Sequence, residues 1–387
     1  MNKIIDIKEY PTPYYIVYES KLRRNLELIK SVTDRAGVTI IMAFKANALW
    51  KTFSVMREYG VASTASSLNE MWLANEELGK LAHSYCPAYT ESTIYKYLQG
   101  SSHITFNSLE QCNRFKPHVD KFNNENKGHT VSCGLRINPM CSVIETDIYN
   151  PCRPGSRFGV TADKISQLPQ WIEGFHFHAL CESTSYDLEK VLTAVEEQFG
   201  QYLPRLKWLN MGGGHLMTRK GYDVEHLIKI LKEFKLRHPN LELILEPGSA
   251  FTWRTGDLIA SVVDIVENNG VKTAIADVSF ACHMPDCLEM PYKPTITESL
   301  PDVDNAKPTY RIGGNSCLSG DFVGDWSFSE PLKESDRLTF EDMNHYTTVK
   351  TNMFNGIQHP SILFARCDGS VELLREFTYE DYKTRMS

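Results

Sequence analysis

The sequence predicts two domains, a (β/α)8 barrel of the TIM type and a second, β-rich domain. Between about residues 38 and 248, short runs with strand-like composition alternate with stretches that have helical apolar spacing. There are eight such units, and eight alternating units favour a closed parallel barrel. After Gly256 the pattern changes to alternating strands that are separated by tight turns.

The eight predicted strands are short runs rich in β-branched, aromatic and other apolar residues. They are Thr39–Phe44, Val61–Thr64, Ser84–Cys86, His103–Phe106, Cys133–Asn138, Gly174–Ala179, Trp208–Met211 and Leu241–Leu245. Between them, two segments show a clear helical stripe. SLNEMWLANEELG has one face with Leu68, Met71, Trp72 and Leu78, and VEHLIKILKEFKLRH has one with Leu227, Ile230, Leu231 and Phe234.

The second domain is predicted from two hairpin signals. Asn269-Gly270 lies inside DIVENNGVKTAIAD, and Asp368-Gly369 lies inside ILFARCDGSVELLREF. Both dipeptides favour a two-residue turn between antiparallel strands. The opening segment IIDIKEY is expected to add an edge strand, which would bring both chain ends into one domain. The expected boundaries are therefore 16–255 for the barrel, and 1–15 together with 256–387 for the β-rich domain.

Composition narrows the classes of partner. The 387 residues carry a formal charge of −7, which argues against a phosphate-backbone partner and suits a cationic substrate. No apolar run approaches the ~18 residues of a membrane helix, and the start lacks the apolar core of a signal peptide. We therefore expect a cytoplasmic protein that binds neither nucleic acid nor membrane. The ten cysteines are scattered without a CxxC pair, which is typical of reduced thiols.

Chemical groups close four of the predicted strands, at the end of the barrel where activity is expected. Lys45 follows the first strand, His178 lies in the sixth, Gly212-Gly213-Gly214 follows the seventh and Glu246 ends the eighth. Alone, each has an ordinary explanation: a solvated lysine, a core histidine, a flexible turn and a strand-ending acid. Together they supply what pyridoxal phosphate needs, namely an amine, a flat ring, a phosphate cradle and an acid for the ring nitrogen.

The position of Lys45 fits this chemistry. An ordinary lysine has a pKa near ~10.4 and is mostly protonated at neutral pH, so it is a poor nucleophile. The apolar run IIMAF precedes Lys45 and would remove water from its amine, and the cationic ring of the cofactor would lie nearby. Both effects would favour the neutral amine. A neutral amine can condense with an aldehyde.

The motifs that carry these residues resemble a known family. AFKAN, FHFHALCE, NMGGG, LILEPG, GNSCLSGD and HYTTVKTNMFNG occur in the order seen in fold-type III pyridoxal-phosphate enzymes, the alanine racemase and ornithine decarboxylase group. FHFHALCES and ACHMPDCLEMPY resemble carboxynorspermidine/carboxyspermidine decarboxylases most strongly. The resemblance implies decarboxylation of carboxynorspermidine or carboxyspermidine to norspermidine or spermidine, in polyamine biosynthesis.

The resemblance also implies roles at the cofactor. Lys45 would bind pyridoxal 5'-phosphate covalently, His178 would stack on its ring and Glu246 would pair with the ring nitrogen. Arg136 matches an arginine near the cofactor. The phosphate would be contacted by Gly212, Gly213, Gly214 and Tyr346.

Catalysis and substrate binding follow from the same resemblance. Cys317 is the implied proton donor, and Cys317 and Asp321 would come from the neighbouring subunit of a homodimer with shared active sites. A carboxypolyamine carries extra ammonium groups, so its pocket should be acidic. The candidate substrate-binding residues are Glu246, Asp286, Asp321 and Glu182.

Three positions depart from the ornithine decarboxylase pattern. Ser249 stands in place of a phosphate-binding arginine, Ser63 replaces an acid near the cofactor, and Cys181 replaces a phosphate-contacting serine. These changes fit a relative with a longer substrate.

Three alternatives stay open at this point. One is another pyridoxal enzyme, such as an ornithine, lysine or diaminopimelate decarboxylase or a racemase. The second is a non-catalytic, decarboxylase-like binding protein. The third is a metal hydrolase that uses His176 and His178, although no further ligand completes a metal site and none is expected.

Overall fold

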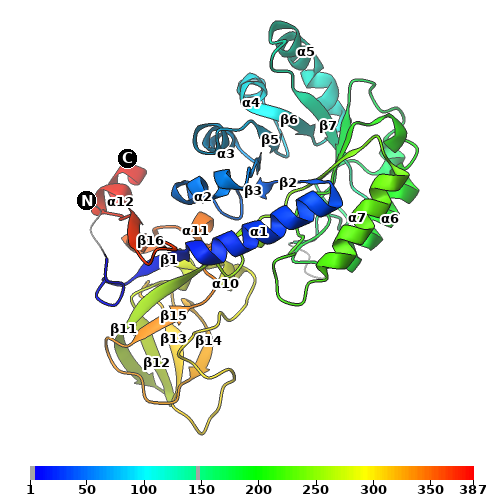
Figure 1. The fold of residues 1–387 in the computed structure, drawn as a ribbon. Helices are drawn as coiled ribbons and strands as arrows, with labels where there is room; N and C mark the ends of the chain where they lie inside the picture. Colours follow the sequence, from blue (N-terminus) through cyan, green and yellow to red (C-terminus); the bar gives the residue numbers. More distant parts are fainter. Residues whose placement is uncertain (1–4, 145–148) are drawn as a thin grey trace. The chain divides into compact units, whose positions relative to one another are not determined.

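The computed structural model describes residues 5–144 and 149–387 (Figure 1). The chain divides into two compact units: Asn25–Phe251 forms one, and Met1–Arg24 with Thr252–Ser387 forms the other. One division falls inside helix α1 (Glu19–Ala36). The domain boundaries expected from the sequence stay predictions, and residues 1–4 lie outside the described residues.

The first unit, Asn25–Phe251, is built on a parallel sheet that closes on itself. The sheet has nine strand segments in the order β2-β10-β9-β8-β7-β6-β5-β4-β3. Their bounds are β2 Thr39–Ile40, β3 Met42–Ala43, β4 Ser63–Ala65, β5 Ala82–Tyr85, β6 Ser101–Phe106, β7 Ser132–Arg136, β8 Gly174–His176, β9 Trp208–Asn210 and β10 Glu242–Leu245.

The barrel closes at Ile41, where the first predicted strand is divided in two. β2 pairs with β10, whereas β3 pairs with β4 on the other side. At the junction, the Ile41 N–H donates to the Leu245 carbonyl (2.9 Å) and the Met42 N–H donates to the Ala62 carbonyl (2.9 Å). One short stretch of chain therefore bonds to both neighbours. The nine segments correspond to the eight predicted strands, and the predicted barrel is confirmed.

Helices lie around the outside of these strands (Figure 1). They are α2 Phe53–Glu58, α3 Leu68–Leu73, α4 Ile94–Gly100, α5 Leu109–Glu125, α6 Ser185–Phe199 and α7 Val224–Arg237. The predicted stripe of α7 is buried throughout. In α3, Met71 is buried, but Trp72 is 41% exposed, so the predicted common face is wrong at Trp72. Trp72 follows Met71 directly, and neighbouring residues of a helix point ~100° apart, so the two side chains face different directions. After Leu73 the chain continues as a π-helix (η2, Ala74–Leu78), so Leu78 is no longer at the regular α-helical spacing from Leu68 and Met71.

The second unit contains an eight-stranded, mostly antiparallel sheet. Its order is β14-β13-β12-β11-β1-β16-β17, and β15 pairs with β11. The strands are β1 Tyr14–Tyr18, β11 Gly256–Asn268, β12 Val271–Ala276, β13 Thr309–Gly313, β14 Phe322–Ser327, β15 Arg337–Phe340, β16 Ser361–Ala365 and β17 Val371–Arg375. Among its short helices are α9 Phe280–His283, α10 Pro285–Glu289, α11 Thr347–Lys350 and α12 Tyr379–Met386, while α8 (Ser249–Thr252) spans the second division of the chain.

Both predicted hairpins are present in this sheet. Asn269 and Gly270, between β11 and β12, have positive φ angles of 49° and 78°, as a tight hairpin turn requires. Gly369, between the antiparallel strands β16 and β17, has φ 87°. A side chain with a Cβ is disfavoured at such angles, which explains the glycines.

The expected edge strand at IIDIKEY is wrong for residues 5–10, which form no strand, and Ile4 lies outside the described residues. The strand begins later, at Tyr14, and β1 lies inside the sheet between β11 and β16. Tyr14–Val17 are all buried, so this apolar run is typical of a central strand. Pro11 and Pro13 precede it, and proline lacks the N–H that a sheet ladder needs.

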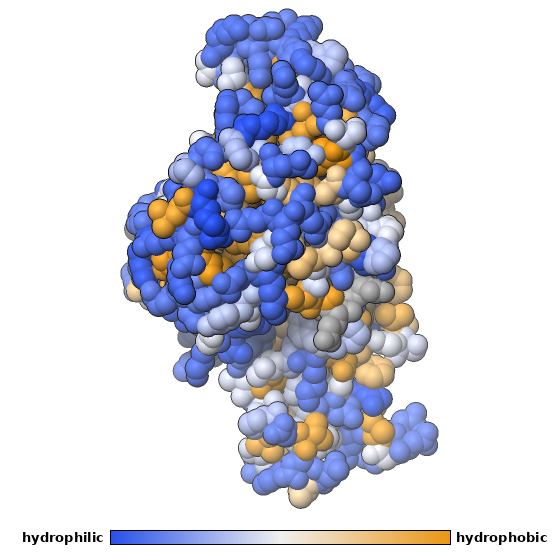
Figure 2. Space-filling model, turned by 90° about the vertical axis from the view of Figure 1, so that its right-hand side faces the viewer, coloured by the Kyte–Doolittle hydropathy of each residue, from blue (hydrophilic) through white to orange (hydrophobic). Residues whose placement is uncertain are grey.

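No helix within residues 5–144 and 149–387 is long and apolar enough to cross a bilayer. The face drawn in Figure 2 is largely hydrophilic, and its hydrophobic side chains lie in separate small groups. All ten cysteines are free thiols.

Inside the barrel, Trp208 fills the space beside two glycines. It is 3% exposed, and its Nε1 donates to Ser132 Oγ (2.9 Å). A Cβ at Gly174 would lie 1.9 Å from Trp208 Cδ2, and one at Gly134 would lie 2.1 Å from Cη2. The indole ring is held by its hydrogen bond and the surrounding core, so it has little room to move aside.

We predict that Gly174→Ala lowers the free energy of unfolding by about 1–3 kcal/mol, because it overpacks the barrel core. Urea unfolding measures the change. Gly128→Ala is the matched control, since a Cβ there meets nothing within 4 Å. Equal stability of the two variants would contradict the packing argument.

Candidate active site

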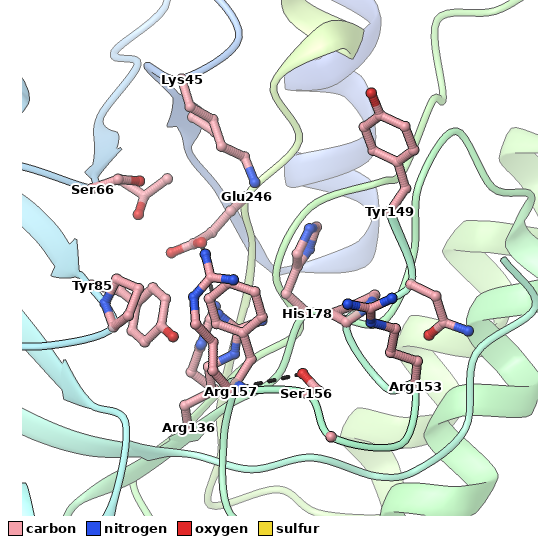
Figure 3. A pocket seen from close by; sticks show the side chains of 18 residues that line it. Lys45, Ser66, Tyr85, Arg136, Tyr149, Arg153, Ser156, Arg157, His178 and Glu246 are labelled. Atoms are coloured by element: carbon pink, nitrogen blue, oxygen red, sulfur yellow. Dashed lines mark hydrogen bonds and ion pairs between the residues drawn. The ribbon is translucent and has the colours of Figure 1, made fainter. Parts of the chain in front are cut away.

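A cavity of about 520 Å³ opens at the carboxyl ends of the barrel strands (Figure 3). In barrels of this type, chemistry is located at that end. The cavity is lined by residues at or just after the ends of six strands, among them Lys45, Thr64, Tyr85, Arg136, His178 and Glu246. Four of these six are residues that the sequence pointed out, so the structure brings Lys45, Arg136, His178 and Glu246 together.

Lys45 lies in the turn that follows β3, and the Ala46 N–H closes this turn on the Ala43 carbonyl (3.0 Å). Its side chain extends into the cavity (Figure 3). The side chain is exposed to this hollow, and many atoms of the barrel lie near it. Loss of hydration lowers the pKa of Lys45, and the positive charge of Arg136 lowers it further, against the opposing effect of Glu246. The balance is thereby shifted toward the neutral amine.

Glu246 immediately follows β10 and is 9% exposed. Its Oε1 accepts a hydrogen bond from Asn210 Nδ2 (2.7 Å), and its Oε2 lies 3.5 Å from His176 Nε2. Burial alone would raise the pKa of Glu246, but the interactions with His176 and Asn210 outweigh it and lower the pKa to about 2. The carboxylate is therefore a buried anion at neutral pH.

His178 follows β8 and is oriented by the glycine run. Its Nδ1 accepts a hydrogen bond from the Gly213 N–H (3.0 Å), so this nitrogen carries no proton. Burial lowers the pKa of His178 well below its usual value, and the positive charges of Lys45 and Arg136 act in the same direction. The result is a neutral, fixed imidazole, which suits a ring that stacks on an aromatic cofactor.

The glycine run is needed for packing as well as for any ligand. Gly212 and Gly214 have φ angles of 66° and 90°, and a Cβ at either would lie 2.3 Å from backbone atoms of the preceding strand-end segment. The Gly212 N–H donates to Asn210 Oδ1 (2.9 Å), and the Gly213 N–H is used by His178. The expected phosphate contact therefore rests mainly on Gly214.

Arg136 is the last residue of β7 and is 4% exposed. Its guanidinium carbon lies 4.6 Å from the centre of the Tyr85 ring and 4.4 Å from that of Phe158. Burial lowers the pKa of Arg136, but arginine stays charged in proteins. The two rings hold this positive charge in the wall of the cavity.

Glu182 lies apart from this group. It is exposed, and its Oε2 is 3.9 Å from Arg219 Nη1, while Arg219 Nη2 donates to the Glu182 carbonyl (3.2 Å). It is not among the described residues that line the cavity. Its assignment to substrate binding stays a prediction.

In the second unit, Cys317 and Asp321 belong to one loop between β13 and β14. Cys317 is exposed, and its N–H donates to Asn355 Oδ1 (2.8 Å). Asp321 is buried, and its carboxylate accepts hydrogen bonds from the Ala281 N–H (2.9 Å) and from Ser316 Oγ (2.6 Å) and N (3.2 Å). This carboxylate therefore holds the loop that carries Cys317.

Asp286 and Tyr346 lie in a second part of the same unit. Lys350 donates to both Asp286 Oδ1 and Glu289 Oε2. Asp286 and Glu289 are one turn apart on α10, and Lys350 ends α11. Tyr346 immediately precedes α11, in a positive-φ conformation (54°). A four-residue helix thus connects the predicted phosphate-binding tyrosine to the lysine that pairs with Asp286.

Two polar residues that interact with Lys45 or Glu246 were not predicted from the sequence, the acid Glu70 and the amide Asn210. Glu70, in the first turn of α3, accepts a hydrogen bond from the Ser66 N–H (2.5 Å) and raises the pKa of Lys45 by its charge. It provides an acid in a region where Ser63 departs from the ornithine decarboxylase pattern. The Ser67-x-x-Glu70 spacing, with Ser67 capping the helix, was the available signal. Asn210 was also missed, although it is the first residue of the NMGGG motif.

Comparison with known proteins identifies the family. A family model described as "Pyridoxal-dependent decarboxylase, C-terminal sheet domain" matches residues 17–344, which is most of the chain. The chain belongs to the pyridoxal-dependent decarboxylases. Family membership confirms the predicted cofactor, the decarboxylase class and the resemblance stated from the motifs.

Several decarboxylases of this family are similar over nearly the whole chain. A carboxyaminopropylagmatine decarboxylase of Synechocystis sp. is 46% identical over 382 residues, covering 98% of this chain and 96% of the relative. A carboxynorspermidine/carboxyspermidine decarboxylase of Campylobacter jejuni is 40% identical over 385 residues, covering 97% and 98%. The crystal structure of a carboxynorspermidine decarboxylase from Campylobacter jejuni, complexed with norspermidine, matches with a TM-score of 0.88, 38% identity and coverage of 97% and 100%.

The cavity fits the cofactor of the pyridoxal-dependent decarboxylases. Lys45 offers an amine whose pKa is lowered, Glu246 a buried anion and His178 a neutral ring, all at one barrel mouth. The metal-hydrolase alternative is not supported, because the family chemistry is different and His176 lies against Glu246. The roles of individual residues stay predictions.

We predict that Arg136→Met slows the combination of the apo-protein with pyridoxal phosphate at neutral pH. Loss of the guanidinium charge raises the pKa of Lys45, so a smaller fraction of the amine is neutral at a given pH. The rate, followed by absorbance across a pH series, should therefore have its inflection at higher pH than in the wild type. Arg136→Lys keeps the charge and serves as the control. An unchanged inflection in Arg136→Met would contradict this electrostatic role.

Proposed function

We propose that this decarboxylase acts on a carboxypolyamine, carboxynorspermidine or carboxyspermidine, and releases norspermidine or spermidine in polyamine biosynthesis. The observation that carries the proposal is the whole-length similarity to carboxynorspermidine/carboxyspermidine decarboxylases, one of them crystallised with norspermidine. The formal charge of −7 also suits a polycationic substrate. A cytoplasmic location is part of this proposal.

A second candidate substrate is carboxyaminopropylagmatine. The specific observation in its favour is the 46% identity to a carboxyaminopropylagmatine decarboxylase. An agmatine moiety ends in a guanidinium, whereas norspermidine and spermidine end in ammonium groups. A guanidinium favours a fork of two carboxylate oxygens, and the paired acids Asp286 and Glu289 offer such a fork.

The residues of the barrel mouth take the cofactor roles. Lys45 would hold pyridoxal phosphate, His178 would lie against its ring, and the Glu246 carboxylate would accept a hydrogen bond from the protonated ring nitrogen. When bound, the cofactor supplies an electron sink for the bond that breaks as CO2 leaves. Tyr346 and Gly214 would contact the phosphate. Because Glu246 is an anion over the neutral range, it would favour a proton on the ring nitrogen of the bound cofactor at neutral pH.

Asp286 is the proposed partner of the distal cation of the substrate. The ammonium of Lys350 already lies between Asp286 and Glu289, which indicates that these oxygens accept a primary ammonium. A substrate ammonium offers the same donors as Lys350. Glu289 is half-exposed, whereas the Asp286 side chain is largely covered, so Asp286 should contribute more to binding.

Cys317 is the proposed proton donor to the substrate carbon after CO2 has left, and we propose that it acts across a homodimer. Its exposure in the second unit leaves the thiol accessible to a partner chain. Asp321 supports this role by holding the loop, because its carboxylate is already hydrogen-bonded to Ala281 and Ser316. Sedimentation equilibrium that finds only monomer at assay concentrations would contradict the shared site.

We predict that the wild-type protein carries the pyridoxyl adduct on Lys45 after borohydride reduction and releases CO2 from a carboxypolyamine. Mass spectrometry locates the adduct, and Lys45→Ala should lack it. The CO2 assay compares carboxynorspermidine, carboxyspermidine, carboxyaminopropylagmatine, ornithine, lysine and diaminopimelate. Preference for a short diamino acid would overturn the substrate proposal, and CO2 release from none of the six would favour a non-catalytic role.

We predict that Asp286→Asn raises KM for carboxynorspermidine roughly 10- to 100-fold, since a hydrogen bond to a charged group is worth ~1.5–3 kcal/mol. Glu289→Gln should have a smaller effect because that side chain is half-exposed. The adduct on Lys45 and the thermal midpoint report on cofactor loading and folding. If Asp286→Asn and the wild type have the same KM, Asp286 does not bind the distal cation.

A further inference from the structure

Asn210 lies at the end of β9, and its amide connects two parts of the barrel mouth. The residue is 3% exposed. Its Nδ2 donates to Glu246 Oε1 (2.7 Å), and its Oδ1 accepts from the Gly212 N–H (2.9 Å). A carboxylate only accepts and a backbone N–H only donates, so these two partners determine which way the amide points.

The backbone completes a ring of hydrogen bonds around Asn210. The Glu246 N–H donates to the Gly212 carbonyl (2.7 Å), so Glu246 and Gly212 are joined both directly and through the asparagine. Next along the chain, the Gly213 N–H orients His178. The three groups proposed to contact the cofactor, which are the acid, the stacking imidazole and the glycine run, are therefore one hydrogen-bonded assembly.

We infer that Asn210 is a positioning residue that keeps Glu246 an anion, directs its carboxylate and fixes the glycine run at a set separation from it. The inference rests on the proposed role of Glu246 at the ring nitrogen. The two ends of the cofactor, its ring nitrogen and its phosphate, would then be received by groups whose spacing a single side chain controls.

An amide does what a carboxylate at this position would not. An aspartate would still accept from Gly212, but it would place a second carboxylate within hydrogen-bonding distance of Glu246. Two carboxylates at hydrogen-bonding distance share one proton. The pKa for the loss of this shared proton is raised, because its loss would leave two adjacent negative charges. Asn210 carries no charge at any pH, so it donates to Glu246 without adding a second anion. The other described titratable groups that face Glu246 are His176, 3.5 Å from its Oε2, and His83, Lys45 and Arg136, and none of them is an acid.

The test is Asn210→Asp, compared with the wild type as the apo-protein and after addition of pyridoxal phosphate. At acidic pH the shared proton restores a donor to Glu246, so the variant should bind the cofactor nearly as well as the wild type. As the pH rises and this proton is lost, we expect the ratio of variant to wild-type dissociation constants to rise roughly tenfold or more, because a one-unit pKa change is tenfold in an equilibrium. Quenching of tryptophan fluorescence measures binding.

A second measurement needs no cofactor. The carboxylate pair in folded Asn210→Asp has a pKa above that of an unfolded acid, so the unfolded state loses its proton first as the pH rises. The stability of the apo-variant relative to the wild type should therefore fall from about pH 4 upward, until the pair has ionised. Urea unfolding at several pH values measures this fall.

Asn210→Asp/Glu246→Gln is the matched control. Here the glutamine amide donates to the aspartate, so the pairing is restored with its direction reversed. We expect the pH dependence of both binding and stability to disappear, while decarboxylation stays impaired because the ring nitrogen has lost its acid. If the single variant does not fold, folding of the double variant supports the inference, and failure of both to fold overturns it.

Two results separate this inference from the proposed function. In the first case, the wild type binds pyridoxal phosphate on Lys45, and Asn210→Asp has the same dissociation constant and the same stability as the wild type at every pH. The inference on Asn210 is then wrong, and the proposed function stands. If the wild type forms no adduct on Lys45, the proposed function fails, and the pH-dependent stability of the apo-variant still decides whether Asn210 controls the ionisation of Glu246.

Discussion

The arrangement of the barrel mouth depends on the hydrogen bonds at the seam near Ile41. Because β2 bonds to β10 and β3 bonds to β4, the first strand segment ends beside the last one. Lys45 follows β3, and Glu246 follows β10. Lys45 and Glu246 are about 200 positions apart in the sequence. Backbone pairing of the barrel strands alone brings them to one cavity.

The charges at this mouth balance one another. Glu246 is a buried anion, Arg136 is a buried cation between two rings, and Lys45 is moved toward its neutral form by lost hydration and by Arg136. Burying an ion without a partner is costly, so these groups stabilise one another only as a set. Such a set shifts the amine toward the form that reacts with an aldehyde and leaves an ionised carboxylate in the same cavity, which agrees with membership of the pyridoxal-dependent decarboxylases.

Much of this could be predicted from the sequence because the information is local. Strand runs such as Trp208–Met211 are short and apolar, and Lys45, His178 and Glu246 lie at the ends of such runs. The glycine dipeptides at 269–270 and 368–369 determine the hairpins through their φ angles. The residues at the strand ends pointed to pyridoxal phosphate, and the family motifs added the decarboxylase class and the substrate.

The features that were missed depend on contacts between distant residues or on small shifts of phase. Asn210 meets Glu246 across 36 positions, and Lys350 meets Asp286 across 64, and neither pairing has a periodic pattern. Trp72 lies in α3 next to the buried Met71 but is exposed, because neighbouring residues of a helix point ~100° apart. Two glycine N–H groups that looked free in the sequence are used within the barrel, by Asn210 and His178.

Lys350 supplies a positive charge to the acid pair Asp286 and Glu289 within the chain itself. Unoccupied acids of like charge repel and would weaken the surrounding fold until a ligand arrived. An internal ammonium relieves that repulsion from the moment of folding. In the role proposed for Asp286, the distal ammonium of the substrate would have to displace the Lys350 ammonium, and a ligand with a single weak charge would gain less from that exchange than a polycation.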